Sequence, residues 1–263
     1  MRETLETTVV EFTPETGIGH ITLNRPDALN ALSDQLRADL IEGLRLLESE
    51  NEDQDGIALR AVIVEGADGN FCAGADITEF SESNPGASSE RHHYEFIMEF
   101  PVPVIAKIRG YCLGGGLETA MACDFRFADE DARFGLPEVD LGIVPGAGGV
   151  QFISRLANPA AAKEIAMTGE HISADRARDL GIVTRVPDNL DEATRDFAET
   201  IASKPPLSIQ AIKESGNIAT QTGLREGRQY DRRLFERLLE TADHEEGAKA
   251  FAEDDYEPEF RGR

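Results

Sequence analysis

The sequence predicts an α/β fold in which strands and helices form layers. Three short apolar segments, at residues 61–64, 102–108 and 125–128, have the composition of buried strands. Between them lie segments whose apolar residues recur at helical spacing, and glycine-rich turns join the two kinds of element. Strand–helix units that follow one another pack their helices on a shared sheet, so we expect a layered α/β core.

The length and composition favour a globular protein with a large core. The chain has 263 residues, of which 40% are hydrophobic, and no apolar run approaches the roughly 18 residues of a membrane span. The first residues are charged and form no signal segment. The three cysteines, Cys72, Cys112 and Cys123, lack the spacing of a metal site. We therefore expect a cytoplasmic protein with reduced thiols, no bound metal and no membrane partner.

Acidic residues dominate the charge of the chain. There are 50 of them against 26 basic residues, which gives a net charge of −24, and they are scattered rather than collected in a tail. Such a distribution is typical of the solvated surface of a halophilic protein, whose self-repulsion is screened by salt. An ordinary acidic protein at moderate salt is the alternative. In either case nucleic acid is a poor partner, because its phosphates would be repelled.

The N-terminal third contains a hairpin and an amphipathic helix. Polar and apolar residues alternate at 8–13 and 17–24, with a turn between them, which predicts two antiparallel strands. Ser33 is expected to cap a helix. The apolar stripe of that helix consists of Leu36, Leu40, Leu44 and Leu47. The buried strand at 61–64 follows and ends near Gly66.

The central part alternates glycine-rich turns with short elements. Residues 70–77 form a first turn, and residues 81–89, rich in Ser, Gly and Pro, form a loop beside which His92 and His93 are expected to be exposed. A helix with Tyr94 and Met98, which are candidates either for lining a substrate pocket or for core packing, precedes the strand at 102–108. Beyond the strand at 125–128 we expect a packed turn system at 134–149, helices at 150–156 and 173–180, and a last strand at 182–186.

The C-terminal part is helical almost throughout. Apolar residues at helical spacing predict helices at 190–202, 206–220, 224–241 and 245–252. The Lys204-Pro205-Pro206 segment interrupts this pattern and is the best domain boundary. We therefore divide the chain into a core, residues 1–203, and a helical region, residues 204–263, whose apolar faces would pack on the core or on another subunit.

The glycine turn at 110–116 is the first indication of chemistry. An apolar strand ends before it and a helix begins after it, so free backbone N–H groups and the positive end of the helix dipole suit an anion. Glu118 stands one turn into that helix and would repel a permanently charged phosphate. The combination therefore favours a negative oxygen that forms only during a reaction.

Two carboxylates are candidates for acid–base chemistry. Glu118 and Glu138 both lie in glycine-rich, otherwise apolar surroundings, where burial would raise their pKa toward neutrality. With 50 acidic residues in the chain, their position beside glycines can also be a coincidence. If the two glycine turns meet, the backbone N–H groups around Ala75 and Gly115 would converge on one carbonyl oxygen and stabilise an enolate.

Four segments of the chain resemble the signature segments of the crotonase family, and most closely those of its enoyl-CoA hydratases. They are NRPDALNAL at 24–32, FCAGADI at 71–77, GYCLGGGLETAMACD at 110–124 and FGLPEVDLGIVPGAGG at 134–149, in the family's order and spacing. Residues 172–181 extend the match. The resemblance implies an α/β spiral of repeated β–β–α units followed by a C-terminal helical region. It also implies homotrimers, commonly paired into hexamers, and a lyase of fatty-acid β-oxidation.

The resemblance further implies a reaction and the residues that carry it. The backbone N–H groups of Ala75 and Gly115 would form an oxyanion hole for the thioester carbonyl of a trans-2-enoyl-CoA. Glu118 would take a proton from the attacking water and Glu138 would deliver a proton to Cα, so that water adds reversibly and syn to give a 3-hydroxyacyl-CoA. No cofactor is implied, because coenzyme A is part of the substrate, and no metal is required.

Two rival functions remain open from the sequence. Relatives that isomerise, decarboxylate or dehalogenate their substrates commonly lack one of the two glutamates. The joint presence of Glu118 and Glu138 therefore favours a hydratase over an isomerase or another lyase of the family. A non-catalytic acyl-CoA-binding or assembly subunit is the alternative from a different class, although such a subunit has no need of buried carboxylates.

Positions that match the family's motifs give the expected substrate contacts, which are Arg25, Ala28, Ala73, Asp76, Ile77 and Gly114. The family often has lysines for the coenzyme A phosphates at three places where this chain has Asp27, Thr78 and, approximately, Asp254. The candidates to replace these lysines are Arg25, Arg261 and Arg263. We attribute the loss of the lysines to the same acidic composition that marks the whole chain.

This loss of positive charge predicts an unusual salt dependence. We expect the KM for an acyl-CoA to fall as salt rises toward molar concentrations, because screening removes the repulsion between the acidic protein and the phosphates of the substrate. Steady-state kinetics across a salt series measures this effect. A KM that rises steadily with salt would contradict the interpretation.

Overall fold

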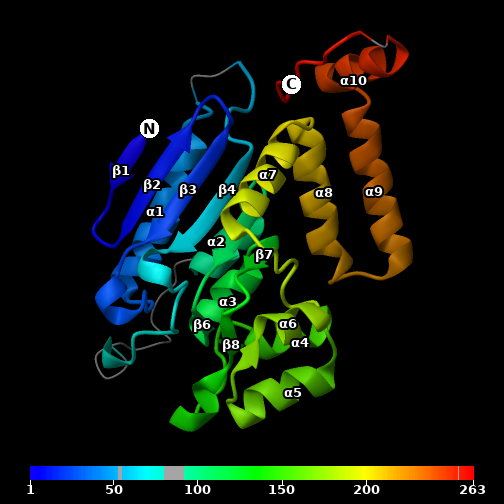
Figure 1. Ribbon diagram of the computed structural model, residues 1–263. Coiled ribbons are helices and arrows are strands. Elements are labelled where there is room, and N and C mark those ends of the chain that lie inside the picture. Colours follow the sequence, from blue (N-terminus) through cyan, green and yellow to red (C-terminus); the bar gives the residue numbers. More distant parts are fainter. Residues whose placement is uncertain (53–54, 80–91, 254) are drawn as a thin grey trace.

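The computed structural model describes residues 1–52, 55–79, 92–253 and 255–263. In these ranges a six-stranded sheet has the order β1-β2-β3-β4-β5-β7 (Figure 1). The pairs β1–β2 and β2–β3 are antiparallel, and the pairs β3–β4, β4–β5 and β5–β7 are parallel. The α/β class predicted from the sequence is confirmed. The strands are β1 (Arg2–Thr4), β2 (Thr8–Thr13), β3 (Ile18–Leu23), β4 (Ala61–Gly66), β5 (Val104–Ile108) and β7 (Phe125–Ala128).

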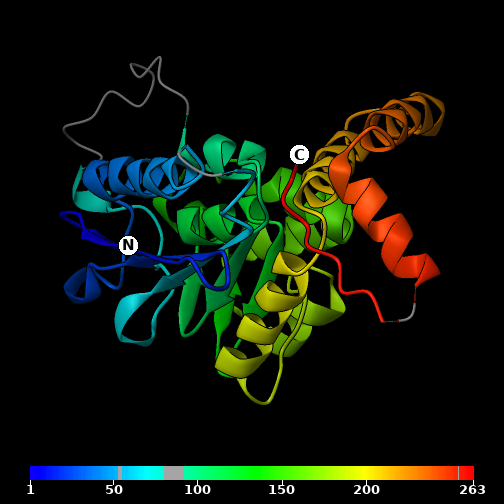
Figure 2. The ribbon, with the colours of Figure 1, turned by 90° about the horizontal axis from the view of Figure 1, so that it is seen from above.

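Helices cover both faces of this sheet. Helix α1 (Asp34–Ser49) packs on β2 and β3, and α7 (Leu190–Ala202) packs on the opposite face, as Figure 2 shows. The predicted cap of α1 is confirmed, because the Ser33 hydroxyl accepts a hydrogen bond from the Leu36 N–H at 3.1 Å. The four leucines of the predicted stripe are fully buried. Burial of such side chains is the main favourable term that holds this layer together.

A second sheet lies next to the first and was not predicted. Within the described residues it has three short strands in the order β6-β8-β9, which are β6 (Tyr111–Leu113), β8 (Arg133–Gly135) and β9 (Ile172–Ser173). Strand β6 follows β5 directly and leads into helix α3 (Gly115–Ala122). The element directly before α3 is therefore β6 of this small sheet, and not β5 of the large sheet.

The predicted strand at 182–186 is wrong. In this segment only Arg185 forms a bridge, to Phe127, among the residues that the structure describes. The N–H groups of Ile182 and Val183 donate to the Ala177 carbonyl oxygen at 2.9 and 3.1 Å, and the Ile182 carbonyl oxygen accepts from Nε of the Arg126 side chain at 2.6 Å. The backbone groups of Ile182 and Val183 are therefore already used outside the sheet, and pairing with β7 is limited to the next two residues.

Helix α2 (His93–Glu99) packs on α3, and this packing buries its first residue, which was expected to be exposed. His93 is only 4% exposed, and its Nε2 lies 2.8 Å from the Thr119 Oγ1 of α3. The expected exposure of His93 is therefore wrong, whereas His92 is exposed. Burial lowers the pKa of His93 to about 3, so its ring is neutral at physiological pH.

The helices of the second half largely follow the prediction. Helix α5 (Pro159–Thr168) was not predicted. Helix α9 (Leu224–Leu238) ends before residue 241, because the Thr241 hydroxyl caps α10 (Ala242–Ala252) by accepting from the His244 N–H. The short helices η1 (Pro26–Ala28), η2 (Ala67–Gly69), η3 (Ile77–Glu79) and η4 (Pro137–Leu141) lie in the connections. The remaining α-helices are α4 (Gly149–Leu156), α5 (Pro159–Thr168), α6 (Ala174–Asp179), α8 (Pro206–Ala219), α9 (Leu224–Leu238) and α10 (Ala242–Ala252).

A buried lysine fixes α8 on the core. The Lys213 Nζ donates to the Asp124 carboxylate at 2.7 Å and to the carbonyl oxygens of Ile97 and Val102 at 3.3 and 3.1 Å. Burial raises the pKa of Asp124, and the nearby Lys213 ammonium opposes that rise. Such a pair is costly to break, because either partner alone would be a buried charge. The division at residues 203 and 204 stays a prediction, since α8 belongs to the helical region yet packs on the core.

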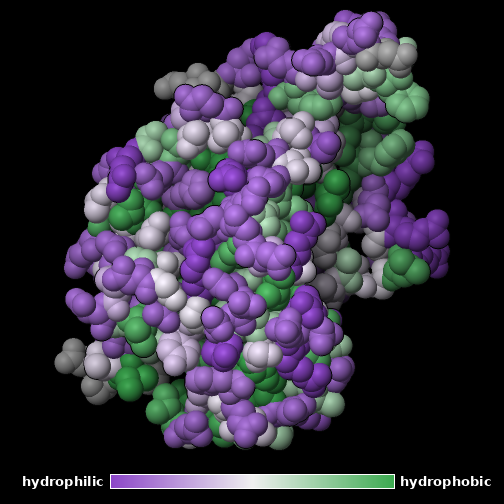
Figure 3. All heavy atoms as spheres, in the orientation of Figure 1, coloured by the Kyte–Doolittle hydropathy of each residue, from purple (hydrophilic) through white to green (hydrophobic). Residues whose placement is uncertain are grey.

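The visible face of the molecule is hydrophilic over most of its area, as expected for so acidic a chain (Figure 3). In the described ranges, no helix has the length and apolar composition needed to cross a membrane. The loop predicted at 81–89 and the position of Asp254 lie outside the described residues.

Candidate active site

The site begins where β6 passes into α3. Gly114 precedes the helix with a φ of +50°, a conformation that side chains other than glycine's rarely adopt. Gly116 allows the helix to lie directly on the backbone of Cys72, because a Cβ atom at Gly116 would stand 2.3 Å from the Cys72 carbonyl oxygen. The first turn of α3, with its free N–H groups, is therefore held against the segment that begins at Cys72.

That segment brings a second free N–H group to the same place. Leu32 pairs with the residues on either side of Ala75, since its N–H donates to the Gly74 oxygen at 2.8 Å and its oxygen accepts from the Asp76 N–H at 3.0 Å. The N–H of Ala75 consequently faces away from Leu32. The Ala75 nitrogen lies 3.6 Å from the point that a Cβ of Gly115 would occupy. Neither the Ala75 N–H nor the Gly115 N–H donates a hydrogen bond to any described residue.

Glu118 projects from α3 and is held by the loop before α4. Glu118 is only 3% exposed, and its Oε1 accepts hydrogen bonds from the backbone N–H groups of Ala147 and Gly149 at 2.8 and 2.7 Å. Burial raises the pKa of Glu118, although these N–H donors act in the opposite direction. Its Oε2 accepts no hydrogen bond from the described part of the chain. One oxygen is thus fixed and the other is left for a further partner.

Glu138 comes to the same space from η4. Its Oε2 is buried and has no hydrogen-bond partner among the described residues, which is a costly arrangement for a carboxyl group. Its Oε1 stands 2.9 Å from where a Cβ of Gly114 would lie. Burial raises the pKa of Glu138, and the negative charge of Glu118 raises it further. The two carboxyl groups therefore influence each other beside the two free N–H groups, and both hold protons more readily than ordinary glutamates.

The remaining predicted contact residues form a rim around these groups. The Arg25 guanidinium donates to the Asp76 carboxylate at 2.9 Å and to the Ala31 carbonyl oxygen at 2.5 Å, so its charge is already paired. Hydrogen bonds from Thr78 and from Arg25 lower the pKa of Asp76. Ala28 and Ala73 are half-buried, Ile77 is exposed, and the Ala73 N–H donates to the Leu29 oxygen at 3.1 Å, which ties the two parts of the rim together.

Two of the arginines proposed as lysine replacements lie elsewhere. Arg261 and Arg263 both pair with Asp55, with nitrogen–oxygen distances of 3.5 and 2.6 Å. Asp55 precedes the start of β4, whereas the segment with Ala75 follows its end. Within this chain the two arginines therefore sit at the opposite end of the sheet from the site. Asp27 and Thr78 are exposed on the rim, as the sequence places them.

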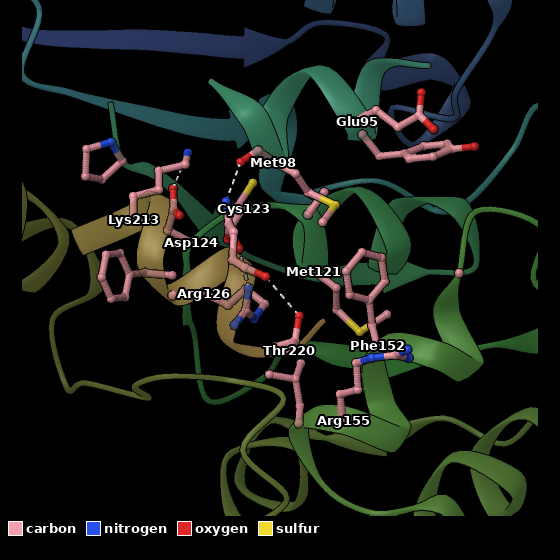
Figure 4. A pocket seen from close by; sticks show the side chains of 18 of the residues that line it. Glu95, Met98, Met121, Cys123, Asp124, Arg126, Phe152, Arg155, Lys213 and Thr220 are labelled. Atoms are coloured by element: carbon pink, nitrogen blue, oxygen red, sulfur yellow. Dashed lines mark hydrogen bonds and ion pairs between the residues drawn. The ribbon is translucent and has the colours of Figure 1, made fainter. Parts of the chain in front are cut away.

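An apolar cavity of about 820 Å³ opens next to Glu118. Ala147 and Gly148, in the loop that holds Glu118, are part of its lining. The cavity lies between α2, α3, α4 and α8 (Figure 4). Tyr94 and Met98 line it, as the sequence suggested, together with Met121, Phe152 and Ile212, which sequence reasoning missed. The helical spacing of α8 showed that it has an apolar face, but no pattern in the sequence says which part of the core that face covers.

The chain is similar to known enoyl-CoA hydratases over most of its length. A family model described as enoyl-CoA hydratase/isomerase matches residues 13–263. The chain is 38% identical to a mitochondrial enoyl-CoA hydratase of Pongo abelii, over 90% of this chain and 81% of that protein. It is 38% identical to a probable enoyl-CoA hydratase of Rhizobium meliloti, over 94% and 95% of the two chains. A crystal structure of an enoyl-CoA hydratase from Bacillus anthracis is 36% identical and superposes with a TM-score of 0.85, over 98% of this chain and 100% of that one.

The close approach at Gly116 predicts a large effect of a small substitution. In Gly116→Ala the added methyl group would meet the Cys72 backbone, so α3 must shift, and the free energy of unfolding should fall by about 1–3 kcal/mol. Gly146→Ala is the matched control, because a Cβ there meets nothing within 4 Å. Urea unfolding of both variants measures the difference, and equal stabilities would contradict the packing described for α3.

Proposed function

Because the chain belongs to the enoyl-CoA hydratase/isomerase family, we propose that it is an enoyl-CoA hydratase. It adds water reversibly to a trans-2-enoyl-CoA and gives a 3-hydroxyacyl-CoA. The observation that supports this best is the pair Glu118 and Glu138, two carboxyl groups of raised pKa on either side of one space. Hydration needs both a base for water and an acid for carbon, and two carboxyl groups divide that work.

The two free N–H groups provide the electrophilic part of the site. In the proposed complex the thioester oxygen accepts hydrogen bonds from Ala75 and Gly115. As water attacks Cβ, electrons move toward that oxygen and an enolate forms, so these bonds strengthen in the transition state more than in the ground state. A single donor of this kind contributes about 3 kcal/mol to catalysis. Because the N–H groups stabilise the charge that develops on the thioester oxygen, the proposed reaction requires no metal and no cofactor beyond the coenzyme A of the substrate.

The glutamates complete the proton balance. Oε1 of Glu118 is already occupied by two N–H groups, so Oε2 is the oxygen that positions the water and takes its proton. The remaining hydroxide forms the C–O bond at Cβ. Glu138 gives a proton to Cα, and the enolate electrons return to form the new C–H bond. Dehydration runs through the same groups in reverse, with each glutamate in the opposite role.

The cavity beside Glu118 holds the acyl chain in this proposal. Ala147 lines it and also donates its N–H to Glu118, so an acyl chain in the cavity would begin near that glutamate, and the apolar walls suit methylene groups. Coenzyme A then lies outside, along the rim formed by Arg25 and the residues after Ala73. The net charge of −24 continues to make nucleic acid an unfavourable partner.

We further propose that the chain assembles with copies of itself, as a trimer or a pair of trimers in the cytoplasm. Large apolar side chains on the last two helices support self-association, since Leu224, Phe235 and Phe251 are 82%, 52% and 95% exposed. In Figure 1 helix α9 stands apart from the central sheet, so its apolar side is available to another subunit.

The decisive assay is the loss of enoyl absorbance from crotonyl-CoA at high salt. We expect activity in the unmodified protein and a fall of about 10²–10⁴-fold in Glu118→Gln and in Glu138→Gln, because each loses one proton-transfer group. Glu164→Gln removes the same charge at an exposed position of α5 and should change the rate little.

Three outcomes would contradict the proposal. An unmodified protein that binds acyl-CoA tightly but is inactive would indicate the non-catalytic alternative. A fully active Glu118→Gln/Glu138→Gln double variant would exclude these glutamates. Movement of a double bond without addition of water would favour an isomerase.

A further inference from the structure

The acyl cavity has the opposite charge balance to the rest of the chain. Among the described residues that line it, three are cationic, Arg126, Arg155 and Lys213, and two are acidic, Glu95 and Asp124. In the whole sequence acidic residues outnumber basic ones by 50 to 26. A cavity built only for hydrocarbon has no need of this reversal.

Two of the three cations have structural partners that account for them. Lys213 pairs with Asp124 at 2.7 Å. Arg126 is buried, and its guanidinium donates to the carbonyl oxygens of Ile182 and Cys123, each at 2.6 Å. These side chains hold the wall of the cavity in place and have little capacity left for a ligand.

Arg155 is different. Its Nη1 donates to the backbone oxygen of Gln151 at 3.1 Å and to the Gln151 side-chain oxygen at 3.0 Å. It forms no ion pair with any acidic residue in the described ranges. Glu95, the other acidic residue of the cavity, lies in the upper right of Figure 4, and Arg155 lies in its lower part. Arg155 and Gln151 are exposed, so Gln151 orients the guanidinium where the cavity meets solvent, and its charge has no acidic partner in the described ranges.

Helix α4 connects Arg155 with the loop that holds Glu118. Gly148, Gln151, Phe152 and Arg155 all line the cavity, at the spacing of one helix face. The N–H of Gly149 binds Glu118, and Arg155 follows six residues later, which corresponds to about 9 Å along the helix. Between these ends the walls are apolar, with Met98, Met121 and Phe152 (Figure 4).

From this arrangement we infer that the acyl chain of the preferred substrate ends in a carboxylate, which pairs with Arg155. The inference rests on the proposed hydratase function and names its substrate class: 2-enoyl-CoA thioesters with a second carboxyl group at the far end of the chain. The rise of about 9 Å separates two backbone positions of α4, and a medium-length acyl chain that runs along this helix would reach the turn that carries Arg155. The methylene groups lie against the apolar walls, and the guanidinium receives the terminal carboxylate through charge-assisted hydrogen bonds.

Paired substrates of one length test this inference in the intact protein. The ratio of kcat/KM values is measured at high salt for a medium-chain trans-2-enoyl-CoA that ends in a carboxylate and for its counterpart that ends in a methyl group. We expect the carboxylate to be preferred by about tenfold to a hundredfold, as for a hydrogen bond to a charged group. A preference for the methyl end would overturn the inference.

Variants at Arg155 separate this pairing from a general effect of charge. Arg155→Gln should abolish the preference, and Arg155→Lys should retain part of it, because an ammonium keeps the charge but loses the planar fork. Arg232→Gln removes the same charge from an exposed pair on α9 and should leave the ratio as it is. A preference that survives Arg155→Gln would show that Arg155 is only a solvated residue in the last turn of α4.

Crotonyl-CoA distinguishes a failure of the inference from a failure of the proposed function. It has no distal carboxylate, so its turnover depends on the glutamates and the N–H groups alone. If it is hydrated while the carboxylate and methyl substrates react equally, only the inference fails. If none of the three is hydrated, the proposed function fails, and the affinities of the saturated carboxylate-ended and methyl-ended acyl-CoAs then test Arg155 directly, where equal affinities overturn it.

Discussion

The contact between the start of α3 and the Cys72 backbone is the constraint on which the site depends. Gly116 leaves no room for a side chain there, and this brings the free N–H groups of Ala75 and Gly115 next to each other. The same placement sends Glu118 from the first turn of α3 toward the loop at Ala147. A shift of about 1 Å at this contact would separate the two donors, and groups that act on one oxygen tolerate little such error.

Charge is distributed in two ways that serve different purposes. Acidic residues cover the surface, where water and salt screen them, and give the chain its net charge of −24. Among the residues that line the acyl cavity the balance is reversed, and Asp124 there is paired with Lys213. Oε2 of Glu138, which lies outside that lining, is buried and has no hydrogen-bond partner among the described residues. An unpaired buried oxygen is costly to the fold. The unpaired Oε2 belongs to Glu138, which is the residue that delivers a proton in the proposed reaction.

Much of the fold could be predicted from the sequence because the signals are local. The Ser33 cap and the leucine stripe of α1 lie within 15 residues, and the central strands are continuous apolar runs. The small sheet escaped prediction because strands of two or three residues show no periodicity. The strand expected at 182–186 is absent from the described structure because Ile182 and Val183 donate their N–H groups to Ala177, in α6, and the Ile182 oxygen accepts from the Arg126 side chain. For the site, the family's motifs named candidate residues that the fold brings near one another. They could not predict the wall that α8 adds, since its placement depends on Lys213 reaching a partner 89 positions away.

The central claim is that the N–H groups of Ala75 and Gly115 hold the carbonyl oxygen while Glu118 and Glu138 flank the reacting carbons. A crystal structure with an unreactive acyl-CoA bound at high salt tests this most directly. The claim predicts that the thioester oxygen lies about 2.7–3.1 Å from both nitrogens, with Cα and Cβ between the two carboxyl groups and the chain directed into the cavity. A thioester oxygen that contacts neither nitrogen, or a chain that leaves the cavity empty, would contradict the claim.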